Sequence, residues 1–459
     1  MTIKIFNTLT NKKETFKPVK EGLMGMYNCG PTVYNYAHIG NLRAYVLADT
    51  IRRAFEYAGY EVKQVINITD VGHIVADLDT GDDKIEKAAR LARKTATEIS
   101  TFYTEAFFRD LEALNIKTAG TIFPKATDHI PEQISLIEQL KKKGYTYKTS
   151  DGIYYDTSKF PDYGKLGNIN IKGLKEGARV ETNQEKKNAT DFALWKFSKP
   201  QEKRQQEWPS PWGIGFPGWH IECSAMSMKY LGQTFDIHTG GIDHIPVHHN
   251  NEIAQSEAAT GKQYVDYWLH NAFINVAGGK MAKSEDNFIR LETLTDKNID
   301  PLAYRYWLLG AHYRTPMLFS FEALEGAQNA YVRLKNAIDI LPVGGSISEL
   351  YKKQYEEKIK DDLDTPGVLA LIWQILKDES VNSADKKATI LDIDKLLGLR
   401  LDMIGVADVI PDEINSMAQD REEARKNKDW AKADEIRKSI EEKGYVLNDT
   451  EKGYSIKKK

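Results

Sequence analysis

Residues 23–41, LMGMYNCGPTVYNYAHIGN, and residues 61–70, EVKQVINITD, decide the fold expected for this chain. The apolar run that ends at Gly30–Pro31 predicts a buried strand followed by a turn. After HIGN, apolar residues recur at helical spacing as far as Gly59, which ends the pattern. Residues 61–70 predict a second strand. Strand, helix and strand in this order predict a βαβ unit of parallel sheet with a right-handed crossover.

The carboxyl ends of these two strands form the expected ligand-binding edge, because ligands of open parallel sheets gather there. Cys29 follows the first predicted strand, and Thr69 lies at the end of the second. Both residues are therefore candidates for a binding site.

The remaining sequence divides into segments of different amino-acid composition and hydrophobic pattern. Short Tyr-, Gly- and Lys-rich segments with a hairpin around Ser150–Gly152 indicate an insertion, after which sheet-like runs resume at 193–197, 235–241 and 271–276. Long amphipathic stretches after residue 300 indicate helices. We predict an α/β protein with a Rossmann-type parallel-sheet domain split by an insertion, then an all-α helical bundle and a small C-terminal module. The expected segments are 1–114, the first half of the Rossmann domain; 115–195, the inserted connective subdomain; 196–300, the second half; 301–400, the bundle; and 401–459, the terminal module.

Composition narrows the class of protein. The 459 residues are 41% hydrophobic and 28% charged with a net charge of −3, which is typical of a soluble globular protein without a global basic field. The N-terminal residues lack a signal-peptide pattern, and no apolar run is long enough to cross a membrane. Two cysteines in so long a chain favour a reducing compartment over a disulfide scaffold. We expect a cytoplasmic protein without membrane contact, and a monomer by default.

The stretch 218–252, GWHIECSAMSMKYLGQTFDIHTGGIDHIPVHHNNE, is the strongest candidate for chemistry. It holds Cys223, one of the two cysteines, and five of the ten histidines. His248 and Glu252 are four residues apart, so they share a face if they lie on a helix. With Cys29 they could complete a tetrahedral zinc shell of two thiolates, an imidazole and a carboxylate. The spacing alone also fits two buried cysteines that act as small hydrophobic residues.

Two further motifs have groups that could bind a nucleoside triphosphate. His38-Ile39-Gly40-Asn41 opens a predicted helix, where unpaired N–H groups and a partial positive charge favour phosphate. Lys280-Met281-Ala282-Lys283-Ser284 follows AGG and offers mobile cations for charge that develops in a transition state. Taken alone, the first motif also fits a satisfied core histidine and the second a solvated lysine pair.

A third motif, Gly240-Gly241-Ile242-Asp243, directly follows the predicted strand FDIHT. Paired glycines admit a ligand against the backbone, and the carboxylate can accept hydrogen bonds from ribose hydroxyls. The same four residues can also simply close a turn.

The order of these motifs resembles a class I aminoacyl-tRNA synthetase, with a HIGH-like tetrapeptide after the first strand, an insertion, and a KMSKS-like pentapeptide after the last strand. Cys29, GWHIECSAM and HHNNE narrow the resemblance to the cysteinyl-tRNA synthetase family. NITD at 67–70, DDLDTPG at 361–367 and REEARKNKDWAKADEIR at 421–437 extend it over essentially the whole chain.

The resemblance implies the roles of individual residues. One zinc ion per chain is held by Cys29, Cys223, His248 and Glu252, and Thr69 and Trp219 lie close to the bound cysteine. ATP, brought with Mg²⁺, is bound by His38, Gly40, Asn41, Gly240, Gly241, Asp243 and Lys283. The groups that face the phosphates during catalysis are His38, Asn41, Lys280 and Lys283. His38, His220, His238, His248 and His249 match a histidine cluster of the family beneath the site.

The implied reaction has two steps. The carboxylate of L-cysteine attacks the α-phosphate of Mg-ATP and gives cysteinyl-adenylate and pyrophosphate; the 3′-terminal ribose of tRNA(Cys) then takes the cysteinyl group. Zinc binds thiolate strongly and hydroxyl poorly, so a zinc–thiolate bond would select cysteine over serine without a separate editing site.

Four departures from the family pattern stand out. Asn41 replaces the last histidine of HIGH, and Ala282 replaces the first serine of KMSKS. The segment 71–82 is longer than usual and brings His73, to which we assign no role. The sequence IDHIPVHHNNE lacks the commoner Met-Phe-Pro before the histidine pair, which leaves the contribution of His244 or His249 to the metal open.

The terminal module is expected to bind the anticodon, with Trp430, Arg437 and the final lysines as candidate contacts. A plain helical hairpin that stabilises the bundle is the alternative. Two other functions compete with the synthetase: a paralogue that joins activated cysteine to a small amino sugar, and a non-catalytic zinc- or nucleotide-binding regulator. The segment 421–437 favours the synthetase over the first, and intact His38, Lys280 and Lys283 favour it over the second.

Overall fold

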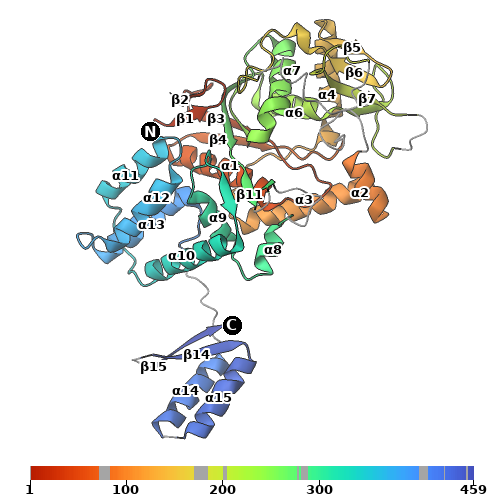
Figure 1. Ribbon diagram of the computed structural model, residues 1–459. Helices are drawn as coiled ribbons and strands as arrows, with labels where there is room; N and C mark the ends of the chain where they lie inside the picture. The colour runs from red at the N-terminus through yellow and green to blue at the C-terminus, as the bar shows by residue number, and fades with distance from the viewer. Residues whose placement is uncertain are drawn as a thin grey trace.

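The computed structural model (Figure 1) describes residues 2–71, 83–169, 185–199, 204–276, 279–280, 288–402, 412–427, 429–450 and 453–458. Its centre is a parallel sheet in the order β10-β9-β3-β4, formed by β3 (Leu23–Asn28), β4 (Glu61–Ile66), β9 (Phe235–Gly241) and β10 (Val265–Asn271). Helix α1 (Ile39–Tyr57) connects the parallel pair β3 and β4. The predicted βαβ unit is therefore confirmed.

The sheet brings distant parts of the chain together at one edge. β3 pairs with β4 on one side and with β9 on the other, although β9 follows about 170 residues after β4 in the sequence. Helix α7 (Asn250–Thr260) connects β9 to β10. A short hairpin, β1 (Lys4–Asn7) and β2 (Lys12–Thr15), lies beside β10. The residues after β3, β4, β9 and β10 consequently meet at the carboxyl edge of the sheet.

The insertion extends further than expected. After α2 (Lys84–Ala92) and α3 (Ala96–Ala113), the short helix Ala126–His129 and α4 (Ile130–Lys142) lead into an antiparallel sheet in the order β5-β6-β7-β8. Its strands are β5 (Thr146–Lys148), β6 (Gly152–Tyr155), β7 (Phe192–Phe197) and β8 (Gly215–Pro217). The predicted hairpin around Ser150–Gly152 is confirmed.

The expected boundary at residue 195 is wrong, because it falls inside β7. We had placed the run 193–197 in the returning parallel sheet, whereas it pairs antiparallel with β6 and β8. Strand β7 is buried along its length except for its last residue, as a strand of the central sheet would also be. The burial pattern therefore does not reveal which sheet a strand joins. Helix α6 (Trp219–Leu231) then returns the chain to β9.

A second small sheet separates the Rossmann domain from the bundle. β11 (Ile274–Val276) pairs antiparallel with β12 (Gly279–Lys280) and parallel with β13 (Met317–Phe319), so the run 271–276 is split between two sheets. Helices α8 (Leu291–Thr295) and α9 (Pro301–Leu309) lie between β12 and β13 in the sequence. β13 thus lies beyond the boundary that we expected at residue 300.

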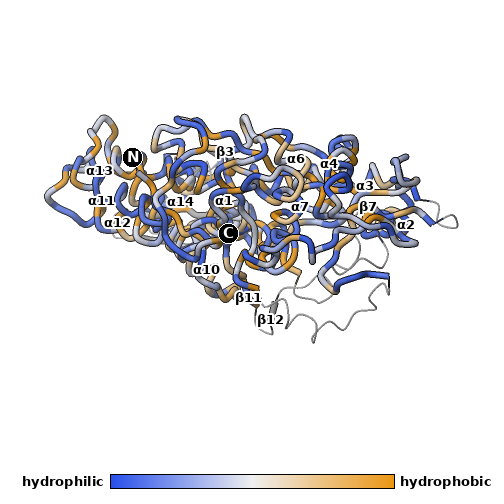
Figure 2. Tube along the Cα trace, turned by 90° about the horizontal axis from the view of Figure 1, so that it is seen from above, coloured by the Kyte–Doolittle hydropathy of each residue, from blue (hydrophilic) through white to orange (hydrophobic). Residues whose placement is uncertain are grey.

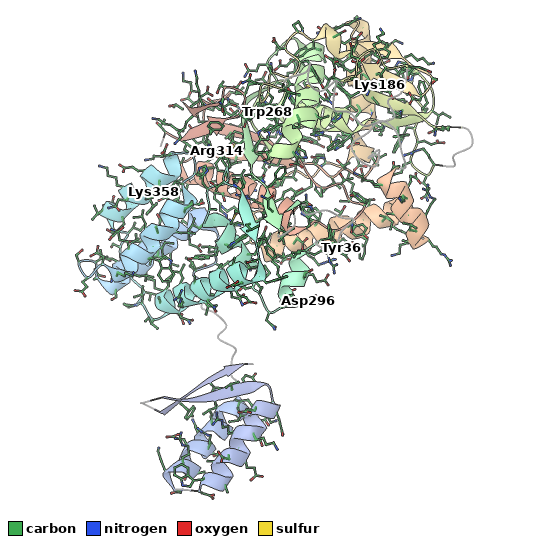
Figure 3. All side chains as sticks on the ribbon, in the orientation of Figure 1. Tyr36, Lys186, Trp268, Asp296, Arg314 and Lys358 are labelled. Atoms are coloured by element: carbon green, nitrogen blue, oxygen red, sulfur yellow. The ribbon has the colours of Figure 1, made fainter. Side chains whose placement is uncertain are left out.

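The predicted helical bundle follows β13. It contains α10 (Phe321–Asp339), α11 (Glu349–Lys360), α12 (Thr365–Lys377) and α13 (Ser383–Leu397). Hydrophobic and hydrophilic residues alternate along these helices (Figure 2), as expected for amphipathic helices that bury one face. Arg314, in the loop before β13, pairs with Asp362 at 2.7 Å and ties this loop to the bundle (Figure 3).

The C-terminal module has a core of its own. Helices α14 (Asp412–Lys426) and α15 (Trp430–Glu442) pack against the hairpin β14 (Tyr445–Thr450) and β15 (Gly453–Lys458). Ile414, Ala418, Ile440 and Leu447 form its hydrophobic core cluster. Helix α15 buries Ala433 and Ile440, and the β-hairpin that follows it was not predicted. In the described part of the chain, no helix is both long and apolar enough to cross a membrane.

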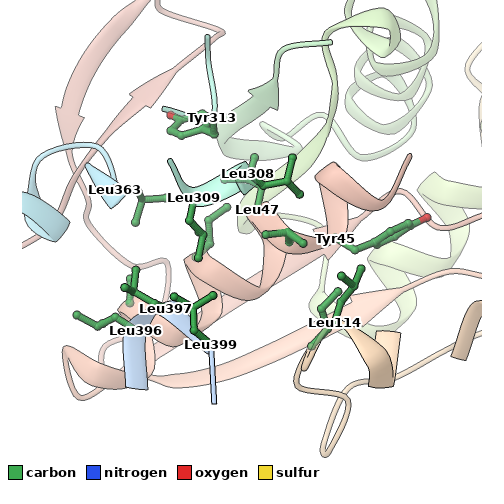
Figure 4. Packing of buried hydrophobic residues seen from close by; sticks show 14 of the residues in the cluster. Tyr45, Leu47, Leu114, Leu308, Leu309, Tyr313, Leu363, Leu396, Leu397 and Leu399 are labelled. Carbon is green, nitrogen blue, oxygen red and sulfur yellow. The ribbon is translucent and has the colours of Figure 1, made fainter. Parts of the chain in front are cut away.

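Helix α1 lies at the centre of the largest hydrophobic core. Leu47 of α1 lies near leucines from α9, the end of α13 and the loop between α11 and α12, and Tyr45 lies beside Leu114 (Figure 4). Asp49 adds a buried ionic junction on the same helix. It accepts hydrogen bonds from Arg53 at 2.7 Å and from Arg305 of α9 at 2.5 Å, and both Asp49 and Arg305 are fully buried. Arg305 also donates to Leu397 O at 2.7 Å, so one cluster joins α1 to the bundle.

Replacement of Asp49 by asparagine should strongly destabilise the packing of α1 against α9 and the bundle, because the buried guanidinium of Arg305 would lose its counter-charge. Breaking a buried ion pair from one side costs about 3–5 kcal/mol. We expect a matching fall in the free energy of unfolding of Asp49→Asn, measured by urea denaturation followed by tryptophan fluorescence. Asp361→Asn is the control, since the exposed pair of Lys13 and Asp361 should contribute less than about 1 kcal/mol.

Acid sensitivity gives a second readout of the same junction. Burial alone would raise the pKa of Asp49, but Arg305 and Arg53 outweigh it and lower the pKa below its usual value. A carboxylate with a lowered folded-state pKa stabilises the fold above its unfolded pKa and loses this contribution as the pH falls. Wild type should therefore lose stability on acidification more steeply than Asp49→Asn. Equal stability of the two proteins at neutral pH would contradict the proposed junction.

Candidate metal and nucleotide site

One cavity of about 230 Å³ opens at the carboxyl edge of the central sheet. Cys29 lies directly after β3, Thr69 after β4, Gly240 at the end of β9 and Asn271 at the end of β10, and all four line this cavity. The edge predicted to bind ligands is therefore hollow. The predicted site residues that line it are Cys29, His38, Gly40, Asn41, Thr69, Trp219, Cys223, Gly240, Gly241, Asp243 and His248.

At the inner end of the cavity, four potential metal ligands converge. One ligand atom each from Cys29, Cys223, His248 and Glu252 lies within 4.8 Å of the others. Cys223 comes from α6, whereas His248 lies in the turn Ile245–His249 that leads into α7, which carries Glu252. The last three are buried and Cys29 is partly exposed to the cavity. Two sulfurs, one nitrogen and one carboxylate oxygen form a donor set that zinc accepts.

The carboxylate of Glu252 has two distinct sides. Its Oε2 accepts hydrogen bonds from Tyr264 at 3.1 Å and from His238 Nε2 at 3.0 Å. Its Oε1 lies 3.0 Å from His248 Nε2, but without hydrogen-bonding geometry, and has no hydrogen-bond partner in the described part of the chain. A buried carboxylate oxygen without a partner is costly unless it binds a cation or a proton. Oε1 is therefore suited to a metal ion, while Oε2 holds the side chain in place.

His248 is oriented in the same manner. Its Nδ1 lies 2.8 Å from Nδ1 of His220, and its ring stacks on Trp219 with a centroid distance of 4.1 Å. These contacts leave Nε2 on the side of Glu252 Oε1, the side of the ligand group. Metal-binding histidines commonly use one ring nitrogen as ligand and fix the other with a neighbouring group.

A second potential ligand set shares part of this group: Cys29, His238, His249 and Glu252. In that set, His238 Nε2 is already hydrogen-bonded to Glu252 Oε2, and its ring stacks on Trp268 with a centroid distance of 4.6 Å. His249 Nδ1 lies 2.8 Å from His270 Nε2, whose Nδ1 lies 2.8 Å from Thr8. His249 Nε2 faces the ligand group, 3.3 Å from Cys29 Sγ, so only His238 of this set already serves as a support. The set with Cys223 and His248 retains more unused donor capacity.

The charged groups at the inner end favour the deprotonated forms of Cys223 and Glu252, the forms that bind a metal ion. The hydrogen bond from Cys29 outweighs burial and lowers the pKa of Cys223 to about 6, and burial raises the pKa of Cys29 itself. Burial alone would lower the pKa of His248, but Glu252 and Cys223 raise it to about 10. Burial would also raise the pKa of Glu252, yet His238 and His248 hold it well below its usual range. The thiolate of Cys223 and the carboxylate of Glu252 are consequently present together, and the imidazolium of His248 compensates part of their charge.

At the outer end of the cavity, HIGN forms the first turn of α1. His38 is the N-cap: its Nδ1 accepts from Asn41 N at 3.1 Å, and its own N donates to Asn41 Oδ1 at 3.3 Å. This reciprocal cap explains how asparagine serves at the fourth position of the motif. Because Nδ1 is the acceptor, the neutral imidazole carries its proton on Nε2. His38 therefore offers a hydrogen-bond donor at a helix N-terminus.

Glycine is required where two loops of the site touch. Gly30 N donates to Asn67 Oδ1 at 2.8 Å, and a Cβ on Gly30 would lie only 1.5 Å from Asn67 O. The same contact places Thr69 beside the loop of Cys29, with Thr69 N donating to Pro31 O at 3.0 Å. A Cβ on Gly240 would lie 2.7 Å from the rings of His244 and His249. Both glycines thus allow backbone and histidine rings to approach closely.

Some predicted residues lie outside the described residues. They are Lys283 with the rest of 281–287, and His73 with the segment 72–82. Lys280 is described only as part of β12, which pairs with β11 next to the cavity residue Ile274. Phe288, on the other side of 281–287, contacts His38 at a ring centroid distance of 5.6 Å. The described residues on both sides of this motif therefore lie close to the cavity.

Sequence reasoning missed several supporting residues. Tyr264 donates to Glu252, His270 contacts His249, and Trp268 stacks on His238. All three lie in or beside β10, outside the motif that they support. His270 in WLHN was the one chemical signal that could have been noticed.

Matches to known proteins cover nearly the whole chain. Residues 15–329 match the family described as "tRNA synthetases class I (C) catalytic domain", and residues 407–455 match "Cysteinyl-tRNA ligase anticodon binding domain". Cysteine–tRNA ligase 1 of Burkholderia lata is 47% identical over 458 residues, covering 99% of this chain and 97% of the relative. Cysteine–tRNA ligase of Treponema denticola is 44% identical over 483 residues, covering 98% of each.

Solved structures show the same fold at low identity. Methionyl-tRNA synthetase of Mycobacterium tuberculosis, in complex with methionyl-adenylate, superposes with a TM-score of 0.55 at 14% identity, over 82% of this chain and 90% of that one. LeuRS of Agrobacterium radiobacter K84, in a ternary complex, superposes with a TM-score of 0.58 at 10% identity, over 85% of each chain. The α/β fold with a following helical region is thereby confirmed. The chain belongs to the cysteinyl-tRNA synthetase family, the ATP-dependent class I ligases that join cysteine to tRNA.

Proposed function

We propose that this enzyme activates L-cysteine with Mg-ATP to cysteinyl-adenylate, releases pyrophosphate, and transfers the cysteinyl group to the 3′ end of tRNA(Cys). The observation that carries this proposal is the continuity of one cavity from the two cysteines to the HIGN turn. A thiol-binding end and a phosphate-binding end are both needed if the carboxylate of cysteine is to attack an α-phosphate. Positioning of two bound reactants is the main source of rate in such a reaction.

Cys29, Cys223, His248 and Glu252 would hold one zinc ion at the inner end. Zinc there would supply a Lewis-acidic centre that binds the thiolate of the substrate and binds the hydroxyl of serine poorly. Oε1 of Glu252, which accepts no hydrogen bond from any described residue, and the fixed ring of His248 support this ligand set. Trp219 and Thr69 line the cavity beside it and would contact the amino acid. A metal–sulfur bond can discriminate between cysteine and serine far better than a hydrophobic pocket can.

The outer end would bind ATP. His38 and Asn41 cap the first turn of α1, where the helix dipole and N–H groups favour phosphate, and Gly40 leaves room for it. Gly240, Gly241 and Asp243 line the same cavity after β9 and would hold the adenosine. Lys280 and Lys283 would stabilise the charge that develops on the departing pyrophosphate. None of these groups needs to act as a nucleophile.

The terminal module would read the anticodon. Trp430 is 60% exposed at the first turn of α15, which suits stacking on an unpaired base. Arg437 lies on the same helix and pairs with Glu441 at 3.5 Å at the surface. The family match over residues 407–455 supports tRNA as the acceptor and disfavours a small amino sugar.

Replacement of Cys223 by serine should remove the zinc and cysteine activation together. Even the loss of a group that only supports a ligand costs about 10- to 100-fold in metal affinity or activity, so the loss of a ligand should cost at least about 100-fold. Zinc per chain is measured by plasma emission spectrometry, and activation by cysteine-dependent ATP–pyrophosphate exchange. Ser224→Ala, at the next position of α6, is the control and should keep its zinc.

The same variant separates the two ligand sets. Cys29 belongs to both sets, whereas Cys223 belongs to only one. One zinc per chain retained in Cys223→Ser, with its loss in His249→Gln, would overturn the set with Cys223 in favour of the other.

Truncation after Asp408 should separate the two reaction steps. We expect loss of cysteine transfer to tRNA, because the module that would bind the anticodon is removed, while cysteine-dependent ATP–pyrophosphate exchange remains close to that of the full chain. The module has its own buried core, so its removal should spare the catalytic body. If the truncated protein folded but lost both activities, the division of labour proposed here would be wrong.

A further inference from the structure

Arg43 is a buried cation that no motif accounts for. It lies on α1, two residues after HIGN, and only 3% of its surface is exposed. Its guanidinium donates to the carbonyl oxygens of five residues, with nitrogen–oxygen distances between 2.7 and 3.4 Å: Ala272, Phe273, His312, Tyr313 and Thr315. In the described part of the chain, it forms no ion pair with a carboxylate.

This arrangement is unusual for a buried arginine, because a desolvated cation normally takes a carboxylate partner. Burial lowers the pKa of Arg43 to about 10, so the side chain is still charged at neutral pH. Hydrogen bonds from a charged donor are stronger than those between neutral groups. Five carbonyl groups that would otherwise repel one another are therefore held around one planar cation.

The five carbonyls belong to two segments that build one wall of the cavity. Ala272 and Phe273 connect β10 to β11, and the cavity is lined by Asn271, Phe273 and Ile274 of this connection. Residues 312–315 precede β13, the parallel partner of β11. The two segments also bond directly, with Ala272 N donating to Tyr313 O at 2.9 Å and Met317 N donating to Phe273 O at 3.1 Å.

Asn271 gives this wall a polar group suited to a ligand. Its amide nitrogen donates to Ala272 O at 3.2 Å, the same oxygen that accepts from Arg43. Its amide oxygen Oδ1 is buried and has no hydrogen-bond partner in the described part of the chain. Since Asn271 lines the cavity and is only 4% exposed, this oxygen can accept from a hydroxyl or amino group of a bound nucleoside.

We propose that Arg43 is a positioning residue for the nucleotide, which fixes the distance between the phosphate-binding turn of α1 and the nucleoside-facing wall Asn271–Ile274. This inference rests on the proposed function and adds to it a residue that would touch neither ATP nor cysteine. The helix supplies the rigid part, because His38, Asn41 and Arg43 share its first two turns. A second link closes the same turn, with Ile39 N donating to Ile289 O at 2.9 Å and Tyr304 donating to Ile39 O at 2.6 Å.

Lysine could not fully replace Arg43. The guanidinium spreads five N–H donors over a plane and reaches carbonyls of two segments at once, whereas an ammonium group offers three donors from one atom. Arg43→Lys should therefore preserve the charge but hold the wall less well. Arg43→Met removes the donors and keeps most of the side-chain volume.

Helix α1 offers a matched control. Arg52 is also buried, at 8% exposed, and its guanidinium donates to the carbonyls of Lys117 and Ala119 at 3.0 and 2.7 Å. These carbonyls lie beside the start of the insertion and not at the cavity. Arg52 also pairs with Glu56 at 2.7 Å, so Arg52→Met removes at least as large a set of polar contacts from the same helix without touching the wall.

The test is cysteine-dependent ATP–pyrophosphate exchange by full-length, zinc-loaded Arg43→Met, Arg43→Lys and Arg52→Met, with separate KM values for ATP and for cysteine. We expect kcat/KM for ATP to fall about 10- to 100-fold in Arg43→Met, as for other misplacements of about 1 Å, and to recover partly in Arg43→Lys. The KM for cysteine and the zinc per chain should stay at wild-type values. Arg52→Met should change thermal stability but not the KM for ATP.

Each other outcome has a definite meaning. A wild-type KM for ATP in folded Arg43→Met, or in Arg43→Lys if only that variant folds, would overturn the inference. Equal losses for ATP and cysteine, or the same loss in Arg52→Met, would reduce Arg43 to a general stabiliser of the fold and also overturn it. If wild type itself showed no cysteine-dependent exchange and bound no ATP by calorimetry, the proposed function would fail instead.

Discussion

The meeting of three chain segments at the carboxyl edge of one parallel sheet is the constraint on which the site depends. The loop after β3 brings Cys29, helix α6 brings Cys223, and α7 with the turn before it brings His248 and Glu252. None of these segments holds a metal set alone. Because β9 pairs with β3 across the whole insertion, the pairing of two strands also brings the two cysteines together. The fold and the ligand group are thus consequences of the same strand order.

The buried charged side chains at this edge are held by neighbouring side chains, which are in turn held by others. Glu252 is held by Tyr264 and His238, His248 by His220 and Trp219, and the supporting groups are themselves packed against aromatic rings. A helix capped by His38 and Asn41 then carries the turn that we propose binds phosphate, and its buried far half is joined to the bundle through Asp49 and Arg305. Helix α1 therefore joins the turn that we propose binds ATP to the helical bundle that precedes the C-terminal module.

The sequence predicted most of the site because its chemistry lies in local motifs. Cys29 and Thr69 follow strands, Gly240 lies at the end of one, His38 caps a helix and Cys223 lies early in α6, and the wall of the cavity is built from such positions. Long-range pairing was not predictable in the same way. Strand β7 is buried like a strand of the central sheet but joins the insertion, and Arg43 donates to carbonyl groups far away in the sequence. Tyr264 and His270 support Glu252 and His249 from in or beside a neighbouring strand, outside any motif. The lysines of 280–284 have no described side chains, so their roles remain predictions.

The measurement that tests the central claim most directly is X-ray absorption at the zinc edge of the zinc-loaded protein, with and without substrate. The account predicts two sulfur scatterers from Cys29 and Cys223 together with nitrogen and oxygen ligands, and one additional sulfur when cysteine is added but not when serine is added. A spectrum with one sulfur, as the set with His238 and His249 requires, would contradict the ligand assignment. An unchanged sulfur count in the presence of cysteine would contradict selection of the substrate by a metal–thiolate bond.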